Sequence, residues 1–194
     1  MKLLLIDACP RSRDVSRSYA LGAAFRDEFI SLHKDAEVEE IRLCDIAMRP
    51  LTEGDITSGN AAPDASGLAL ARQFAAADMI AICAPYWNFL YPALLATYLE
   101  NICVSGITFT YVNDRPQGLC RAKALAYLTS AGGYIGENDW GFKYIRAMCG
   151  QLLGIPAFYR AEAQGLDCDG TDVSAVMAKA TEDARAIARM MGKV

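Results

Sequence analysis

The side chains best suited to binding a ligand fall in three short segments of the sequence. The first is Ser16-Arg17-Ser18, which places two hydroxyls and a guanidinium at the start of a predicted helix. Unpaired backbone N–H groups and the positive end of the helix dipole attract anions there, so a phosphate monoester is the natural ligand. Arg11 and Arg13 add positive charge nearby. An ordinary capped helix with solvated arginines explains this segment equally well.

The second segment is rich in aromatic residues at a point where the chain must turn. Tyr86, Trp87 and Phe89 follow a continuously apolar run that ends at Pro85, and Asn88 supplies an amide among them. Aromatic rings at a loop tip suit stacking against a flat ligand. Packing against a neighbouring helix or a second subunit is an equally good explanation.

The third segment is a glycine-rich loop that follows another apolar run. Gly132 and Gly133 let the backbone approach a planar ligand without an intervening Cβ. Ser130 supplies a hydrogen-bond donor, and Tyr134 can cover the ligand. A phosphate at one end and a flat heterocycle at the other describe flavin mononucleotide (FMN). The three segments together indicate FMN more specifically than any one of them does alone.

The elements that carry these segments alternate between strand-like and helix-like patterns, which predicts an α/β sheet of parallel strands with right-handed crossovers. The expected strands are residues 2–8, 37–43, 79–84, 122–129 and 157–162, and the expected helices are 16–33, 66–77, 92–106, 140–153 and 173–191. The second and fifth strands alternate in polarity and belong at the edges, whereas the others are apolar throughout. The doubly wound order 2-1-3-4-5, with helices on both faces, satisfies this and gathers the three segments at the carboxyl ends of the strands.

Several helix ends can also be predicted from the sequence. Ser16 and Thr171 are the expected N-caps of the first and last helices, and Pro92 suits the first helical position of the third. Residues 107–111 are β-prone, and the turn-rich residues 113–118 follow them. The single histidine, at position 33, is expected at a helix end rather than as a catalytic base.

Composition narrows the possible classes of protein. The 194 residues are 53% hydrophobic, which fits one domain over residues 1–194. The net charge of −4 argues against a nucleic-acid or membrane-surface binder. The apolar run at the N-terminus stops at Asp7, too soon for a signal or a membrane span, so a cytoplasmic protein is expected. Seven scattered cysteines without a Cys-x-x-Cys pair predict reduced thiols and no metal site.

Over nearly its whole length the chain resembles the FMN-dependent NAD(P)H azoreductase and quinone reductase family, which has the flavodoxin-like fold. Besides the three segments, the resemblance rests on residues 105–111, whose pattern Gly-x-Thr-Phe-x-Tyr is the most family-like motif in the chain. The resemblance implies that the first segment holds the FMN phosphate, the second lines the ring and ribityl chain, and the third contacts the ring's pyrimidine end. It also implies a homodimer that buries the flavin near its interface.

The residues expected to bind the cofactor are Cys9, Ser16, Arg17, Ser18, Pro85, Tyr86, Trp87, Asn88, Phe89, Ser130, Gly132 and Gly133. Those expected to form the substrate pocket are Trp87, Phe89, Tyr134 and Trp140, with Tyr144 as a further part of a lid. The chain departs from the family at Cys9, where a serine often helps to bind phosphate, and at Tyr86-Trp87, which replaces a Met-Tyr pair. We expect Cys9 to act as a passive donor or packing residue.

The expected activity is ping-pong reduction of a quinone or an azo compound, in which NADH or NADPH passes hydride to flavin N5 and then leaves the shared pocket. No side-chain acid or base is then needed, and the N–H groups of residues 87–89 are expected to stabilise charge on the reduced ring. A flavodoxin-type electron carrier is the main alternative, although the Thr/Ser-x-Thr-Gly-x-Thr phosphate loop of flavodoxins is absent. A hydrolase is a weaker one, because the chain has one histidine.

Overall fold

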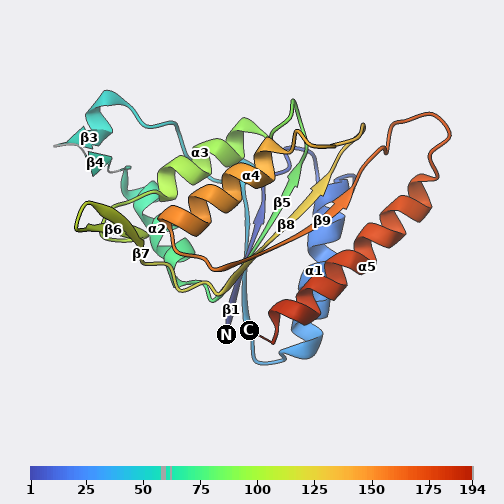
Figure 1. Cartoon of the computed structure of the whole chain (residues 1–194), viewed down its shortest axis with the longest axis horizontal. Helices are drawn as coiled ribbons and strands as arrows, with labels where there is room; N and C mark the ends of the chain where they lie inside the picture. The colour runs from blue at the N-terminus through green and yellow to red at the C-terminus, as the bar shows by residue number, and fades with distance from the viewer. Residues whose placement is uncertain (58–59, 62, 194) are drawn as a thin grey trace.

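The computed structural model describes residues 1–57, 60, 61 and 63–193, and its centre is a five-stranded parallel sheet (Figure 1). The strands are β1 (Lys2–Asp7), β2 (Glu37–Arg42), β5 (Met79–Pro85), β8 (Ala124–Ser130) and β9 (Ala157–Ala163). They lie in the order β2-β1-β5-β8-β9, so their carboxyl ends meet at one edge of the sheet. All five begin and end within two residues of the ranges expected from the sequence.

Burial along the strands follows their sequence patterns. Every residue of β5 and β8 is buried, as is all of β1 except its first residue. The two edge strands β2 and β9 are the ones that alternate in polarity, and most of their residues remain partly exposed. Strands covered on both faces read as continuous apolar runs, whereas a half-solvated edge alternates.

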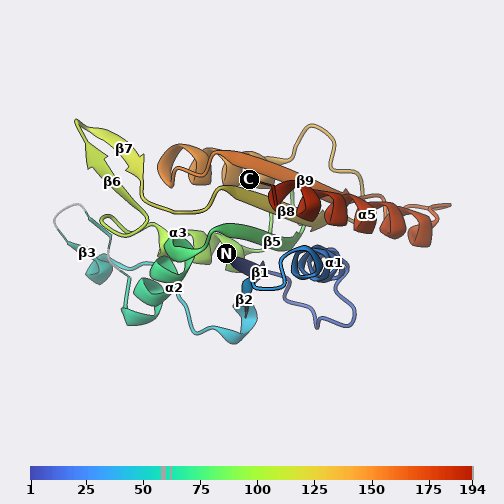
Figure 2. The same ribbon diagram turned by 90° about the horizontal axis from the view of Figure 1, so that it is seen from below.

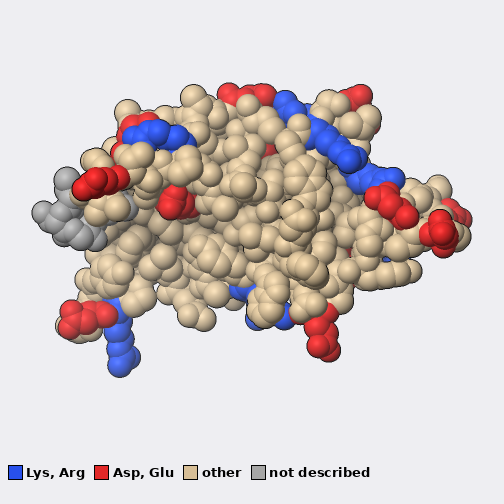
Figure 3. All heavy atoms as spheres, turned by 90° about the horizontal axis from the view of Figure 1, so that it is seen from above, with Lys and Arg blue, Asp and Glu red and all other residues tan. Residues whose placement is uncertain are grey.

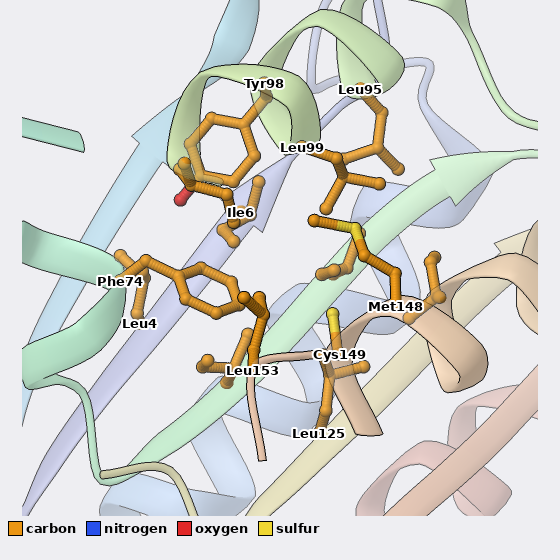
Figure 4. Close-up of a cluster of buried hydrophobic side chains, with 14 of the residues drawn as sticks. Leu4, Ile6, Phe74, Leu95, Tyr98, Leu99, Leu125, Met148, Cys149 and Leu153 are labelled. Atoms are coloured by element: carbon orange, nitrogen blue, oxygen red, sulfur yellow. The ribbon is translucent and has the colours of Figure 1, made fainter. Parts of the chain in front are cut away.

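Helices cover both faces of the sheet (Figures 1 and 2). On one face α1 (Arg17–Leu32) and α5 (Val173–Met191) pack in a cluster that includes Leu3 and Leu5 of β1. On the other face lie α2 (Ala65–Ala76), α3 (Ala93–Ile102) and α4 (Trp140–Ala147), followed by a π-helical turn, η3 (Met148–Leu152). Figure 4 shows two residues of β1 in this second cluster, Leu4 beside Phe74 of α2 and Ile6 beside Tyr98 of α3. The period of two along β1 therefore supplies both cores.

Helix α1 approaches the sheet unusually closely. A Cβ at Gly22 would overlap the Sγ of Cys83 in β5, so only glycine allows this spacing. The helix begins as expected from the sequence, because Ser16 is its N-cap and accepts a hydrogen bond from the backbone N–H of Tyr19 at 3.1 Å. Its C-cap is His33, which matches the helix-end position predicted for the histidine.

Three predicted boundaries are wrong by a short distance. Asp172, not Thr171, caps α5, because its carboxylate accepts the N–H of Ala175 at 3.0 Å. Pro92 has an extended ψ of 143° and precedes α3 rather than forming its first residue. Helix α3 also ends at Ile102, four residues before Gly106, since Thr108 donates its hydroxyl to the Ile102 carbonyl at 2.7 Å.

The remaining elements are short. Residues 113–118, expected to be a turn-rich excursion, instead hold the turn and the returning strand of a hairpin, β6 (Phe109–Val112) and β7 (Arg115–Gly118). Its turn residues Asn113 and Asp114 have φ of 51° and 60°, as a two-residue type I′ turn requires. The loop before α2 holds η1 (Leu43–Asp45), η2 (Glu53–Asp55) and the strands β3 (Ile56–Thr57) and β4 (Asn60–Ala61). Within the described ranges, no helix is long and apolar enough to cross a membrane.

Candidate functional site

A cavity of about 590 Å³, measured out to its open mouth, lies at the carboxyl ends of the central strands. Residues of all three segments singled out in the sequence line it. They are joined by residues of the β1–α1 loop and of the loop after β9. The full lining is Cys9, Arg11, Val15, Ser16, Arg17, Ser18, Pro85, Tyr86, Trp87, Ser130, Ala131, Gly132, Leu166 and Asp167. The parallel sheet therefore converts separate stretches of sequence into one site.

The N-terminus of α1 forms one end of this cavity. Ser16 uses its hydroxyl and carbonyl to accept the N–H groups of Tyr19 and Ala20. The first N–H groups of a helix have no intrahelical partner, so those of Arg17 and Ser18 remain available to a ligand. The hydroxyls of Ser16 and Ser18 lie 3.4 Å apart, and both side chains are buried. The cavity thus has an anion-binding end built from backbone and hydroxyl donors.

The three nearby arginines take different roles. Arg11 lines the cavity. Arg13 turns away from it, with its Nε 3.2 Å from Asp7 and its Nη2 2.6 Å from Glu40. Arg17 also lines the cavity, but its Nη1 lies 2.8 Å from the Oδ1 of Asp167. Of the positive charges expected around a phosphate, only that of Arg11 is left without a carboxylate partner among the described residues.

Asp7 anchors the loop that leads into this end of the cavity. Its side chain is fully buried at the end of β1. One carboxylate oxygen accepts the N–H of Cys9 at 3.1 Å, and the other faces Arg13. Burial raises the pKa of Asp7, while the Cys9 N–H, Arg13 and Arg42 act against that rise. Asp7 therefore fixes the backbone at Cys9 and the course of the β1–α1 loop.

The aromatic segment forms a tight two-residue turn. Trp87 and Leu90 exchange both backbone hydrogen bonds at 2.9 Å, and between them Asn88 and Phe89 have φ of 51° and 67°. A phenylalanine in the left-handed region is strained, and such strain gathers at functional sites. The turn also corrects one expectation, because the N–H of Trp87 already donates to Leu90 and only those of Asn88 and Phe89 remain for a ligand.

Tyr86 connects the aromatic turn to the loop before α4. Its hydroxyl donates to the backbone oxygen of Asn138 at 3.2 Å. Its ring meets the ring of Phe89 edge to face, with centroids 6.4 Å apart. Trp87 and Phe89 remain 40% and 58% exposed at the mouth of the cavity and beside it. This part of the site offers apolar rings to whatever lies against it.

The glycine segment is held by the loop after β9. The carbonyls of Ala131, Gly132 and Gly133 accept N–H groups of Leu166, Asp167 and Gly165, at 3.2, 2.8 and 2.8 Å respectively. A Cβ at Gly132 would overlap the carboxylate of Asp167, whereas the space around Gly133 is open. A side chain at 132 would therefore collide with Asp167, while the approach of a ligand to Gly132 and Gly133 stays a prediction.

Comparison with known proteins identifies the family. A family model described as flavodoxin-like fold matches residues 1–188. The FMN-dependent NADH:quinone oxidoreductase 2 of Clostridium acetobutylicum is 33% identical over 95% of this chain and 96% of its own. The FMN-dependent NADH:quinone oxidoreductase of Caldicellulosiruptor bescii is 31% identical over 97% and 98%. The chain belongs to the FMN-dependent azoreductase and quinone reductase family.

Solved structures agree on the fold of this reductase family. The FMN-dependent NADH-azoreductase of Bacillus anthracis, in complex with FMN, superposes with a TM-score of 0.84 over 99% of this chain and all of that one, at 22% identity. An NAD(P)H:quinone oxidoreductase of Methanothermobacter marburgensis gives a TM-score of 0.74 at 19% identity, over 97% of this chain and 98% of that one. At these identities the likeness establishes the flavodoxin-like fold alone.

In this member of the reductase family, most residues expected at the cofactor line the one cavity. Cys9 does so with its side chain buried, and its carbonyl accepts the Cys44 thiol at 3.7 Å. Six expected residues do not line the cavity: Asn88, Phe89, Gly133, Tyr134, Trp140 and Tyr144. Tyr134 and Trp140 are 74% and 55% exposed. Their roles in cofactor or substrate binding stay predictions.

Sequence reasoning missed the contribution of the loop after β9 to this reductase site. Leu166 and Asp167 line the cavity, as do Val15 and Ala131. The position of Asp167 one loop beyond the last strand is a usable signal, since every parallel strand of such a sheet delivers its following loop to the same edge. Nothing else in the local sequence distinguishes Asp167 from Asp169 or Asp172.

Proposed function

We propose that this protein is an FMN-dependent NADH:quinone oxidoreductase that also reduces azo compounds, acting as a single cytoplasmic domain over residues 1–194. The observation that carries the proposal is one cavity with an anion-binding end at the N-terminus of α1 and aromatic rings at the carboxyl end of β5. The curated relatives named above support NADH as the donor and a quinone as the acceptor. All seven cysteines lie in the described ranges as free thiols, which fits a reducing compartment.

The donors in the cavity fit FMN. A phosphate monoester needs several hydrogen-bond donors and positive potential, and the N-terminus of α1 supplies both together with the Ser16 and Ser18 hydroxyls. The guanidinium of Arg11 adds a full charge. The lining also includes Pro85, Tyr86, Trp87 and residues 130–132, which suit a sugar-like chain leading to a flat ring. The cavity thus runs from an anion-binding end to an aromatic end, which matches the phosphate and the ring of FMN.

FMN supplies the chemistry when it is bound, because it accepts hydride from a nicotinamide and passes it to an acceptor. The residues of the chain orient the ring and exclude water. Trp87 and Phe89 provide apolar surface, and the free N–H groups of Asn88 and Phe89 are the preorganised donors nearest that surface. Asn88 and Phe89 both have a positive φ, which sets the direction of their N–H groups. We infer that the backbone strain of the turn serves to position these two donors.

The acceptor and the nicotinamide are proposed to occupy the same apolar surface in turn. Trp87 and Phe89 form its wall, while Tyr134, Trp140 and Tyr144 form a looser border with 74%, 55% and 51% exposure. Flat, apolar acceptors such as quinones and aromatic azo compounds gain most from these rings. Tyr86 braces the wall through its hydrogen bond to Asn138. Lys143 lies on this border, with its Nζ 4.7 Å from the centroid of the Trp140 ring, so the choice of NADH rests on the names of the curated relatives.

A homodimer is part of the proposal. Tyr134, Trp140 and Tyr144 are all exposed along one stretch of the chain, and exposed apolar side chains that form a contiguous patch mark an interaction site. Figure 3 shows a face on which charged side chains gather at the margin and most of the centre is free of them. Such a face suits a second copy of the chain. Replacing the 55%-exposed Trp140 by Glu should yield monomers in sedimentation, whereas Met190→Glu on α5 should leave the dimer intact.

The test of the function is spectroscopic. The purified protein is mixed with FMN, desalted, and examined in the visible range before and after NADH is added without oxygen. Retained flavin bands that bleach with NADH, and return when a quinone is added, are the expected result. Retained bands that NADH does not bleach would indicate a flavodoxin-type electron carrier instead. Loss of all flavin on desalting would refute the proposal.

A further inference from the structure

The Arg17–Asp167 ion pair is an unusual feature for a pocket that receives an anion. Both residues line the cavity, and the Arg17 Nη1 lies 2.8 Å from the Asp167 Oδ1. Arg17 is the first residue of α1, while Asp167 lies in the loop after β9. The pair thus joins the anion-binding end to the opposite wall, and it introduces a negative charge beside it.

The backbone of Asp167 is fixed beside the glycine segment, while 69% of its side chain is exposed. Its backbone N–H donates to the carbonyl of Gly132 at 2.8 Å, and its carboxylate lies against the Cα of Gly132, where a Cβ would overlap it. The neighbouring Leu166 is bonded to Ala131 in the same way. The backbone at Asp167 is therefore held in place, and the long Arg17 side chain reaches across to its exposed carboxylate.

We propose that Arg17 and Asp167 form a specificity-determining clasp that accepts a flavin ending in one phosphate and rejects a flavin dinucleotide. This inference rests on the proposed function. A single phosphate at the N-terminus of α1 fits behind the closed pair. A ligand that continues beyond that phosphate separates Arg17 from Asp167, and the released carboxylate then faces the second phosphate. Specificity often depends on such a repulsive element as well as on attraction to the right ligand.

The two halves of the clasp give opposite predictions. Asp167→Asn removes the ion pair and the negative charge, so both penalties against the dinucleotide disappear. The ratio of the Kd for FAD to the Kd for FMN should then fall about fivefold, the scale of one partly exposed ion pair. Arg17→Gln removes the ion pair but leaves the carboxylate unpaired. The ratio should therefore stay as high as in the wild type, or rise.

The experiment titrates flavin-free protein with FMN and with FAD and follows the quenching of flavin fluorescence. Asp169→Asn is the matched control, because it removes the same charge two residues along the same loop without touching the cavity. An unchanged ratio in Asp167→Asn would overturn the clasp. An equal fall in both Asp167→Asn and Arg17→Gln would also overturn it, since repulsion by Asp167 would then play no part. Failure of the wild type to bind FMN would instead refute the proposed function.

Discussion

Asp7 Oδ2 lies 3.2 Å from the Nε of Arg13, so a fully buried carboxylate at the end of β1 is tied to the loop that leads into α1. The other oxygen of Asp7 holds the N–H of Cys9. One side chain therefore joins the sheet to the wall of the cavity. Its loss should disturb both stability and cofactor binding.

Asp7→Asn should lower the free energy of unfolding in urea by about 2 kcal/mol. The amide nitrogen that replaces Oδ2 is a buried donor facing the Nε–H of Arg13, and a buried donor without an acceptor costs about 1–3 kcal/mol. FMN affinity should fall as well, because the loop at Cys9 loses its anchor. Asp14→Asn, an exposed change in the same loop, is the control. Equal losses in the two variants would show that Asp7 is not an anchor.

Comparison of the wild type with Asp7→Asn also gives a prediction about how stability depends on pH. Burial raises the pKa of Asp7 above its ordinary value of 3.8, so the folded state binds this proton more tightly than the unfolded state. Stability from Asp7 is thus fully present below the unfolded pKa and is lost as pH rises through the folded one. The margin of wild type over Asp7→Asn should widen as pH is lowered from about 6 to about 4. A narrowing margin in urea unfolding would mean that Arg13 and Arg42 outweigh burial.

Phe89→Gly should separate stability from activity. Phe89 has a φ of 67°, and glycine adopts this conformation without strain, so the thermal midpoint should rise by the equivalent of about 1 kcal/mol. Loss of the ring should lower kcat/KM for a quinone about fivefold. Phe89→Ala is the matched variant, because it loses the ring but keeps the strain. Equal thermal midpoints for Phe89→Gly and Phe89→Ala would show that the backbone at Phe89 is not strained.

Gly132→Ala and Gly133→Ala should differ sharply. A Cβ at 132 displaces the Asp167 carboxylate, whereas a Cβ at 133 meets open space. We expect the first variant to bind FMN about tenfold more weakly, a loss of about 1.4 kcal/mol. The second should bind as the wild type does. Comparable affinities in fluorescence titrations would show that the loop after β9 adapts freely.

Most of the fold could be predicted because its signals are local. The buried strands are apolar runs, the edge strands alternate, and Ser16 has the side chain that an N-cap needs. Errors arose where two residues compete for one role. Thr171 and Asp172 both suit a cap, and the geometry of the chain after the cap decides between them. The returning strand β7 was missed because Pro116 and Gly118 resemble a turn.

The candidate site was predictable in its loops but not in its pairings. Chain order brings residues 16–18, 85–87 and 130–132 together in any sheet of this type. The direction of a long side chain has no such rule. Arg13 turns to a carboxylate that is buried below the loop, and Arg17 reaches another 150 residues further along the chain. These choices depend on partners that only the folded chain brings within reach.

The pairing of Arg17 with Asp167 also has a consequence for protein synthesis. Arg17 is synthesised early, at the start of α1, whereas Asp167 lies in the last loop before α5 and is synthesised late. A nascent chain in which β9 has not yet been synthesised therefore has the anion-binding end of the cavity but lacks Asp167. Discrimination between FMN and FAD should therefore arise only after nearly the whole chain has been translated.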